Sequence, residues 1–218
     1  MPIRYFHAGV LFGIAVDSAR NIQAQPRKGG QKAALVSIVF SVVALEAFMN
    51  EITGAAQDAL AVASYLNPPE LSVFAHVMAD AEDARSRLES KFTLAKWTLA
   101  GKNLERGAPP YQDFALLVRL RNDLVHFKAN DAFDQGTSAE EIHKDLLRRF
   151  GAKHILAEDI EYSAGMWTYL IETKAVAEWS CRTAANMVRE LCASAVQSSI
   201  SPVCENVQKS FEAQCAML

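Results

Sequence analysis

The sequence has few cysteines, and their positions exclude two common classes of protein. All four, Cys181, Cys192, Cys204 and Cys215, lie in the C-terminal part of the chain. None forms the closely spaced pair that a zinc site requires, and a disulfide framework is expected in a smaller chain with a smaller core. We therefore predict buried or half-buried free thiols, with no metal and no other cofactor.

The sequence also lacks an excess of positively charged side chains. The chain has 22 lysines and arginines against 25 aspartates and glutamates, which gives a net charge of -3 and a pI near 6.0. A general electrostatic attraction to nucleic acid is therefore absent. Any contact with a polyanion has to be local.

Long apolar runs are missing as well. The longest, Leu35 to Met49, is shorter than the roughly 18 to 20 residues of a membrane span, and Glu46 interrupts it near its end. The segment Ala8 to Val16 faintly resembles a signal peptide, but no clean small-residue cleavage site follows it. Together with the cysteine usage, these features predict a soluble cytoplasmic protein without membrane contact.

Hydrophobic residues, by contrast, make up 50% of the 218 residues, enough for one substantial core. They recur at helical spacing, and no set of alternating strands is recognisable. We predict an all-α bundle of five to seven helices that forms a single domain over residues 1–218. The apolar helix 31–64 belongs at its centre, and residues 201–218 form a terminal helix or tail.

Periodicity and helix-boundary signals place the elements. The predicted helices cover residues 5–23, 31–64, 68–100, 111–127, 138–150, 158–195 and 201–217. Charges in the third helix, such as Asp83 and Arg87, are spaced to pair along its surface. Ser138 to Glu141 has the spacing of a capping box, and Ser201 with Pro202 resembles a cap and first turn.

The residues that carry chemistry lie near the end of the predicted helix 111–127. Arg121, Asn122 and His126 combine a fixed cation, a hydrogen-bonding amide and a titratable base. At about 100° per residue, Asn122 and His126 share a face, whereas Arg121 and His126 diverge by roughly 140°. One helix cannot aim both at one phosphate, but two copies that meet across a two-fold axis could do so.

A polar stripe on the apolar helix 31–64 adds two supporting candidates. It consists of Glu46, Asn50, Thr53 and Gln57. A glutamate within an apolar run needs a cationic or hydrogen-bonding partner, and we predict that this partner is Arg121. Glu46 and Asn50 are predicted to line a cleft. For Thr53 and Gln57, a plain surface stripe explains the pattern equally well.

The segment Arg121 to His126 resembles the signature of the HEPN superfamily (higher eukaryotes and prokaryotes nucleotide-binding domain). In that signature an arginine, usually followed by a polar residue, precedes a histidine by four to six residues on a late helix of a bundle. Here four residues lie between Arg121 and His126, and Asn122 is the polar residue that follows the arginine. Leu45 to Glu51 is similar to the glutamate-bearing helix that packs beside the motif helix in many members. The resemblance covers mainly residues 31–64 and 111–127.

The resemblance implies a metal-independent endoribonuclease that acts as a dimer with a shared cleft, in toxin-antitoxin, defence or stress systems. His126 would activate the ribose 2′-hydroxyl or protonate the leaving oxygen. Arg121 would hold the phosphate, Asn122 would position the substrate, and Glu46 would orient Arg121. The implied partners are RNA, a second copy of the chain and an antitoxin.

Two other interpretations remain open. Some members of the superfamily do not cut RNA but bind nucleotides or partner proteins, and some pair with nucleotidyltransferases. The acidic net charge allows this, since Arg119, Arg121 and Lys128 are offset by Asp113 and Asp123. Alternatively, the chain is an unrelated helical bundle in which the motif is accidental.

Overall fold

The protein is described by a computed structural model that covers residues 7–23, 31–63, 69–126, 143–157, 167–195 and 200–218. Within these ranges the regular structure consists of nine helices and contains no strand, so the predicted all-α bundle is confirmed. The number of helices exceeds the five to seven that we predict. Two of the predicted long helices are divided, as described below.

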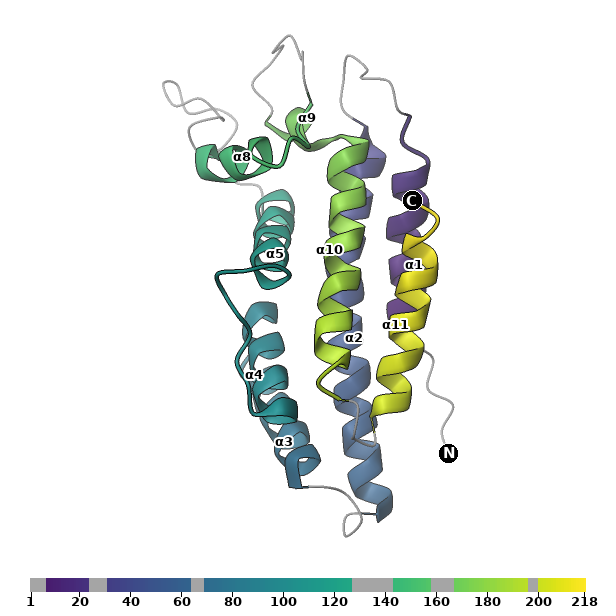
Figure 1. Cartoon of the computed structure of the whole chain (residues 1–218), viewed down its shortest axis with the longest axis vertical. Coiled ribbons are helices and arrows are strands. Elements are labelled where there is room, and N and C mark those ends of the chain that lie inside the picture. The colour runs from purple at the N-terminus through teal and green to yellow at the C-terminus, as the bar shows by residue number, and fades with distance from the viewer. Residues whose placement is uncertain (1–6, 24–30, 64–68, 127–142, 158–166, 196–199) are drawn as a thin grey trace.

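The helices form two groups that run along the same long axis (Figure 1). The first group consists of α1 (His7–Arg20), α2 (Lys32–Ala63), α10 (Lys174–Cys192) and α11 (Ser201–Cys215). The second group consists of α3 (Pro69–Asp83), α4 (Leu88–Ala100) and α5 (Tyr111–Val125). Two short helices, α8 (Lys144–Gly151) and α9 (Thr168–Ile171), lie at one end of the bundle.

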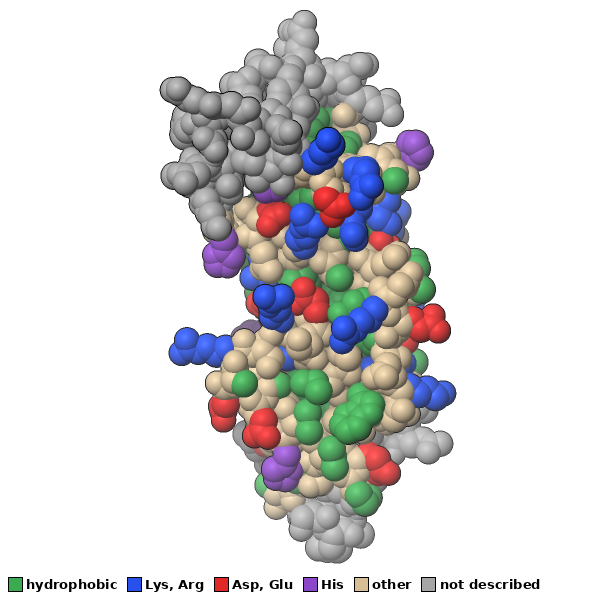
Figure 2. Space-filling view, turned by 90° about the vertical axis from the view of Figure 1, so that its left-hand side faces the viewer, with side chains coloured by type: hydrophobic (Ala, Val, Ile, Leu, Met, Phe, Trp, Pro, Cys, Tyr) green, Lys and Arg blue, Asp and Glu red, His purple; other side chains and the backbone are tan. Residues whose placement is uncertain are grey.

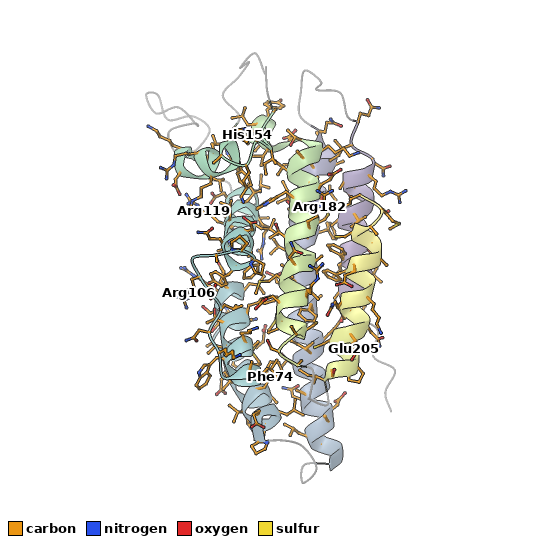
Figure 3. All side chains as sticks on the ribbon, in the orientation of Figure 1. Phe74, Arg106, Arg119, His154, Arg182 and Glu205 are labelled. Carbon is orange, nitrogen blue, oxygen red and sulfur yellow. The ribbon has the colours of Figure 1, made fainter. Side chains whose placement is uncertain are left out.

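Helix α2 is the central element, as its composition predicts. It packs against α1 and α10 on one side and against α3 and α5 on the other. Ile38, Leu45 and Phe48 are fully buried in these contacts, and Phe74 lies on the inner side of α3 (Figure 3). Large apolar side chains that leave water in this way supply most of the stabilisation of a bundle.

The length and composition of α2 also allow a membrane span. The segment Lys32–Ala61 contains an 18-residue window of mean hydropathy 1.9, and half of that window is buried inside the protein. The length of the run Leu35 to Met49 therefore does not by itself exclude a span. A core helix of a bundle satisfies the same criterion, and here α2 is packed against helices on both sides.

The predicted helix 68–100 is wrong in one respect, because it is two helices. At the end of α3 the amide of Ser86 donates to the carbonyl of Ala81 over 2.9 Å, and the amide of Arg85 donates to Glu82 over 2.8 Å. This is the hydrogen-bond pattern of a Schellman motif, and Arg85 has the left-handed φ of 51° that the motif requires. The glycine that usually occupies this position of the motif is absent, so the sequence does not predict the break. The expected helical pairing of Asp83 with Arg87 is lost with it.

The predicted helix 158–195 is likewise interrupted where the structure describes it. Helix α9 ends at Ile171, and Thr173 then acts as the N-cap of α10 by accepting a hydrogen bond from the amide of Val176 over 3.1 Å. The Thr173 hydroxyl donates in turn to the carbonyl of Ile155. A threonine cap without a neighbouring proline or glycine is a weak sequence signal, which explains why it is missed.

The other boundaries agree with the prediction where they can be compared. Helices α1, α2 and α5 lie within the predicted ranges 5–23, 31–64 and 111–127. The capping box at 138–141 lies outside the described residues. Ser201 is not the cap of α11, because Ile200 occupies that position and the Ser201 hydroxyl interacts with Glu205 inside the helix.

The four cysteines are free thiols, as expected, and three are buried. The thiols of Cys192 on α10 and Cys204 on α11 face each other, and this contact together with burial raises the pKa of Cys192. Burial raises the pKa of Cys215 to about 12. These thiols therefore behave as small apolar groups of the core rather than as nucleophiles.

A glycine at the end of α4 provides a test of the fold. Gly101 has a φ of 63° and its amide caps the carbonyl of Trp97, whereas Gly107 in the same connection lacks a positive φ. A side chain at either position would meet no atom within 4 Å. Gly101→Ala should therefore lower the free energy of unfolding by about 1 kcal/mol through backbone strain alone. Gly107→Ala should not lower it in the same urea titration, because alanine restricts the unfolded chain without straining the folded one there, and equal losses for the two variants would contradict the assignment.

Glu51 on α2 links stability to pH. Its carboxylate accepts a hydrogen bond from the amide of Ala8 at the start of α1 over 2.8 Å. Burial raises the pKa of Glu51 above its ordinary value of 4.5, and the amide of Ala8 and the neighbouring His7 only partly offset this. The folded state thus holds this proton more tightly than the unfolded chain does. Stability therefore falls as the pH rises from 4.5 through the raised value.

Glu51→Gln should reduce this loss of stability. Urea unfolding between about pH 4 and pH 8 should show a smaller fall for the variant than for the wild type. Burial raises the pKa of Glu172 in the same direction, so the wild type retains a second contribution that the variant does not remove. An identical pH profile for the two proteins would show that Glu51 is not buried as described.

Candidate functional site

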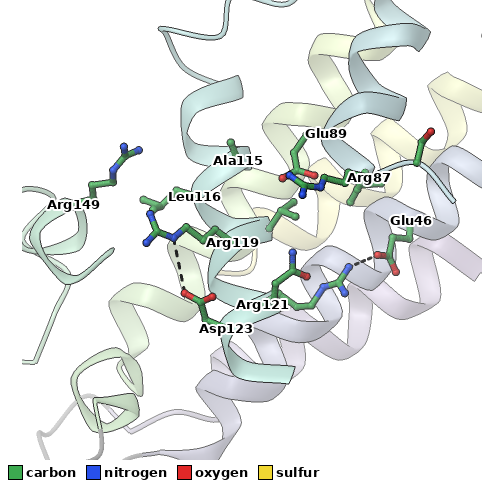
Figure 4. Close-up of a pocket in the computed structure, with 13 residues that line it drawn as sticks. Glu46, Arg87, Glu89, Ala115, Leu116, Arg119, Arg121, Asp123 and Arg149 are labelled. Carbon is green, nitrogen blue, oxygen red and sulfur yellow. Dashed lines mark hydrogen bonds and ion pairs between the residues drawn. The ribbon is translucent and has the colours of Figure 1, made fainter. Parts of the chain in front are cut away.

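The predicted motif borders a cleft on the outer side of α5. The cleft has a volume of about 670 Å³ and lies between the outer side of α5, the middle of α2 and the start of α4, with α8 at its edge (Figure 4). Its charged and amide side chains are Glu46, Arg87, Glu89, Arg119, Arg121, Asn122, Asp123 and Arg149. Such a volume accommodates a ligand of nucleotide size.

The ion pair between Arg121 and Glu46 forms the part of this cleft nearest the core. Helix α5 buries Phe114, Leu117 and Leu120 at helical spacing, which leaves the next residue, Arg121, at the boundary of the core facing α2. There its Nη2 donates to Oε1 of Glu46, as the sequence predicts (Figure 4). The Arg121 side chain is only 17% exposed and that of Glu46 is 42% exposed. The guanidinium is therefore held in one orientation while the carboxylate remains in contact with the cleft.

The next two residues of the motif also face the cleft. Asn122 lines it beside Arg121. Asp123 lies between two basic groups, with its Oδ2 3.9 Å from Nε of Arg119 and 3.6 Å from Nδ1 of His143. The polar face of this helix is therefore a row of charged and amide groups rather than an isolated pair.

His126 lies outside this cleft. It is the C-cap residue of α5, its amide donates to the carbonyl of Asn122 over 2.9 Å, and its side chain is exposed. It is not among the residues that line the cleft, in agreement with the angular separation of Arg121 and His126 expected from helix geometry. A single copy of the chain therefore does not bring the arginine and the histidine together.

The polar stripe of α2 is divided between two depressions. Glu46 belongs to the cleft with Arg121, whereas Asn50 lines a separate groove of about 370 Å³ together with Thr53, Gln57 and residues of α3. Lys91 and Glu82 form an ion pair in that groove. The structure therefore does not bring Asn50 to the predicted site, although Asn50 lies one turn from Glu46.

Three residues of this region are not predicted from the sequence. Arg87 comes from the break between α3 and α4, Arg149 from α8, and His143 from the residue before α8. His143 is only 5% exposed and stacks on Trp167 with 4.1 Å between ring centroids. The spacing of these residues along the chain carries no signal, because only tertiary packing brings them beside α5.

Basic side chains concentrate at the α8 edge of the cleft. Arg119, Arg148 and Arg149 all contact the carboxylate of Asp145, and hydrogen bonds from Arg148 and Arg119 lower the pKa of that carboxyl. Figure 2 shows lysine and arginine side chains gathered around acidic ones in the upper part of this face. Hydrophobic side chains gather lower on the same face. The cleft itself is lined by four arginines and three carboxylates, in a chain whose net charge is negative.

Arginines outnumber carboxylates in the cleft by four to three. Within the described ranges, no group of three or more histidine, cysteine, aspartate or glutamate side chains is placed to hold a metal ion. The cleft offers guanidinium groups and an amide, which are donors suited to phosphate or carboxylate oxygens.

No protein-family model, no curated protein and no solved structure matches this chain. The resemblance to the HEPN superfamily therefore depends on the motif residues and on their placement in a helical bundle.

The Arg121 and Glu46 pair can be tested by a double-mutant cycle of unfolding free energies. Because Arg121 is largely buried, we expect a coupling energy of about 1 to 2 kcal/mol between Arg121→Ala and Glu46→Ala. The pair Lys209 and Glu205, four residues apart on α11 with side chains 73% and 61% exposed, is the control and should give about 0.3 to 0.5 kcal/mol. Equal coupling in the two cycles would mean that the pair in the cleft has no special role.

Proposed function

We propose that the protein is a dimeric, metal-independent endoribonuclease of the HEPN type, with Arg121, Asn122 and His126 as its catalytic residues. The observation that supports this most is the orientation of Arg121. Glu46 fixes its guanidinium in a cleft of about 670 Å³, beside the amide of Asn122. A preoriented cation beside a hydrogen-bonding amide is suited to hold a phosphodiester and the negative charge that develops on it.

The reaction would proceed by transfer within the RNA strand. His126 accepts the proton of a ribose 2′-hydroxyl, whose oxygen forms a bond to the adjacent phosphorus while the bond from phosphorus to the 5′-oxygen breaks. The protonated imidazole returns a proton to that leaving oxygen. The products are a 2′,3′-cyclic phosphate and a 5′-hydroxyl, and Arg121 stabilises the extra negative charge on the phosphoryl oxygens.

The position of His126 supports a shared active site. Its side chain is exposed at the end of α5 and does not line the cleft of its own protomer, and the adjacent Val125 is 53% exposed. An exposed apolar residue beside the histidine provides surface for a second copy of the chain. In a two-fold dimer of this kind, the histidine of each protomer would serve the cleft of the other.

A second candidate is a non-catalytic module that binds a nucleotide or a partner protein. It is favoured by the three carboxylates in the cleft and by the engagement of Arg121 with Glu46, both of which weaken the attraction to a polyanion. In that case the purified protein would not cleave RNA, but Arg121→Ala would still weaken nucleotide binding. A cytoplasmic location and an antitoxin or nucleotidyltransferase partner belong to the proposal in either form.

The shared site can be tested by mixing two inactive variants. Arg121→Ala and His126→Ala should each abolish cleavage of a generic RNA while the dimer stays folded. A mixture that exchanges subunits freely forms heterodimers in about half of the population, and each heterodimer has one intact site. The mixture should therefore recover about one quarter of the wild-type activity.

Two exposed residues provide matched controls for the assay. His76→Ala on α3 and Arg182→Ala on α10 remove the same chemical groups far from the motif along the chain and should retain full activity. Undiminished cleavage by either motif variant would rule out the motif as the catalytic site. Two inactive variants without recovery on mixing would show that both groups act within one protomer.

A further inference from the structure

Three arginines at the α8 edge of the cleft converge on a single carboxylate. Nη1 of Arg119 lies 2.9 Å from Oδ2 of Asp145, Nη2 of Arg148 lies 2.7 Å from Oδ1, and Nε of Arg149 lies 3.3 Å from Oδ2. We call these four residues the rim cluster. Its formal charge is two units positive, although the whole chain carries a net charge of -3.

The way in which α8 packs on the bundle leaves the rim cluster at the surface. Leu146, Leu147 and Phe150 are buried against the bundle, so the positions between and after them face outward. Those outward positions carry Arg148 and Arg149, and Arg119 projects toward them from the outer side of α5 (Figure 3). Two separate helices, α5 and α8, thus direct their guanidinium groups toward the carboxylate of Asp145.

Stability alone does not explain three arginines around one carboxylate. Arg148 is 76% exposed, and exposed ion pairs contribute little because water and salt screen them. Arg119 is shared with Asp123, which lies 3.9 Å from its Nε, but Arg148 and Arg149 both depend on Asp145, so the second of these two cations adds repulsion between guanidinium groups. Forked guanidinium donors match the oxygens of a phosphate, which carries more negative charge than a carboxylate.

We propose that the rim cluster is a second phosphate-binding site, distinct from the site at Arg121. Two of its residues, Arg119 and Arg149, line the same cleft as Arg121. One ligand can therefore place one phosphate at Arg121 and another at the rim cluster, a step that rests on the proposed function. The ligand class is a molecule with at least two phosphate groups. Its source is either the backbone of a nucleic-acid strand or the polyphosphate of a nucleotide.

The test compares two double variants that each remove two positive charges around one carboxylate. Arg148→Ala with Arg149→Ala alters the rim cluster. Lys174→Ala with Arg182→Ala alters the matched control, where both cations contact Glu178 on α10. Binding of a short single-stranded RNA with a 5′-hydroxyl and of ATP is measured at several salt concentrations, in a His126→Ala background that removes the proposed cleavage.

The rim variant should bind at least one of the two probes at least tenfold more weakly, since about 1.4 kcal/mol of lost charge-assisted contact corresponds to a factor of ten. The salt dependence of RNA binding should fall by about 1.4 in slope if the strand is the ligand. Weakened binding of RNA alone would identify the strand as the source of the phosphates, and weakened binding of ATP alone would identify the nucleotide.

Unchanged affinity for both probes in the rim variant would overturn the proposal. An equal loss in the control variant would also overturn it, because general electrostatics would then explain the effect. Both outcomes can be distinguished from the absence of nuclease activity, which would contradict the proposed function alone. A protein that cleaves no RNA but loses phosphate binding in the rim variant would retain this site.

Discussion

The interaction on which the site depends is the ion pair between Glu46 and Arg121. A glutamate in the most apolar helix of the bundle would be costly to leave unpaired, and a cation near the core is costly for the same reason. Each of the two residues is therefore tolerated because of the other. Their pairing joins the polar face of α5 to α2, beside the apolar contacts between the two helices.

From this fixed point the polar face of α5 extends outward toward α8. Asn122 and Asp123 follow on the cleft side, and Arg119 then reaches Asp145 on α8. The break between α3 and α4 also contributes a residue to this region. The turn at Arg85 brings Arg87 to the cleft at the start of α4. Charged groups from four separate segments thus meet along one helix, while the buried face of that helix remains apolar.

Much of the fold could be predicted from the sequence, because long helices with regular apolar spacing leave little choice. The central helix and the motif helix are examples. The pairing of Glu46 with Arg121 could also be predicted, from the apolar neighbours of Glu46 along its helix, although the Glu46 side chain is 42% exposed. The break after α3 could not be predicted, since Arg85 adopts a backbone conformation that glycine usually signals. Thr173 likewise caps α10 without a proline or glycine nearby.

The site could be predicted only in part, for a related reason. Residues within one helix, such as Arg121 and Asn122, have positions that follow from helix geometry. His143 and Arg149 reach the same region through tertiary packing that leaves no pattern in the sequence. Asn50 shows the converse, because it shares a helical stripe with Glu46 and yet lies in another groove. Along a long helix, residues on the same face can therefore contact different neighbouring helices.

The most direct measurement is the distance, in a crystal structure of the proposed dimer, between the guanidinium of Arg121 in one protomer and the imidazole of His126 of the partner subunit. We expect both groups to face one cleft and to lie within hydrogen-bond reach, about 3 Å, of a single bound phosphate. A monomer, or a dimer in which the two groups point into separate environments, would contradict a shared active site.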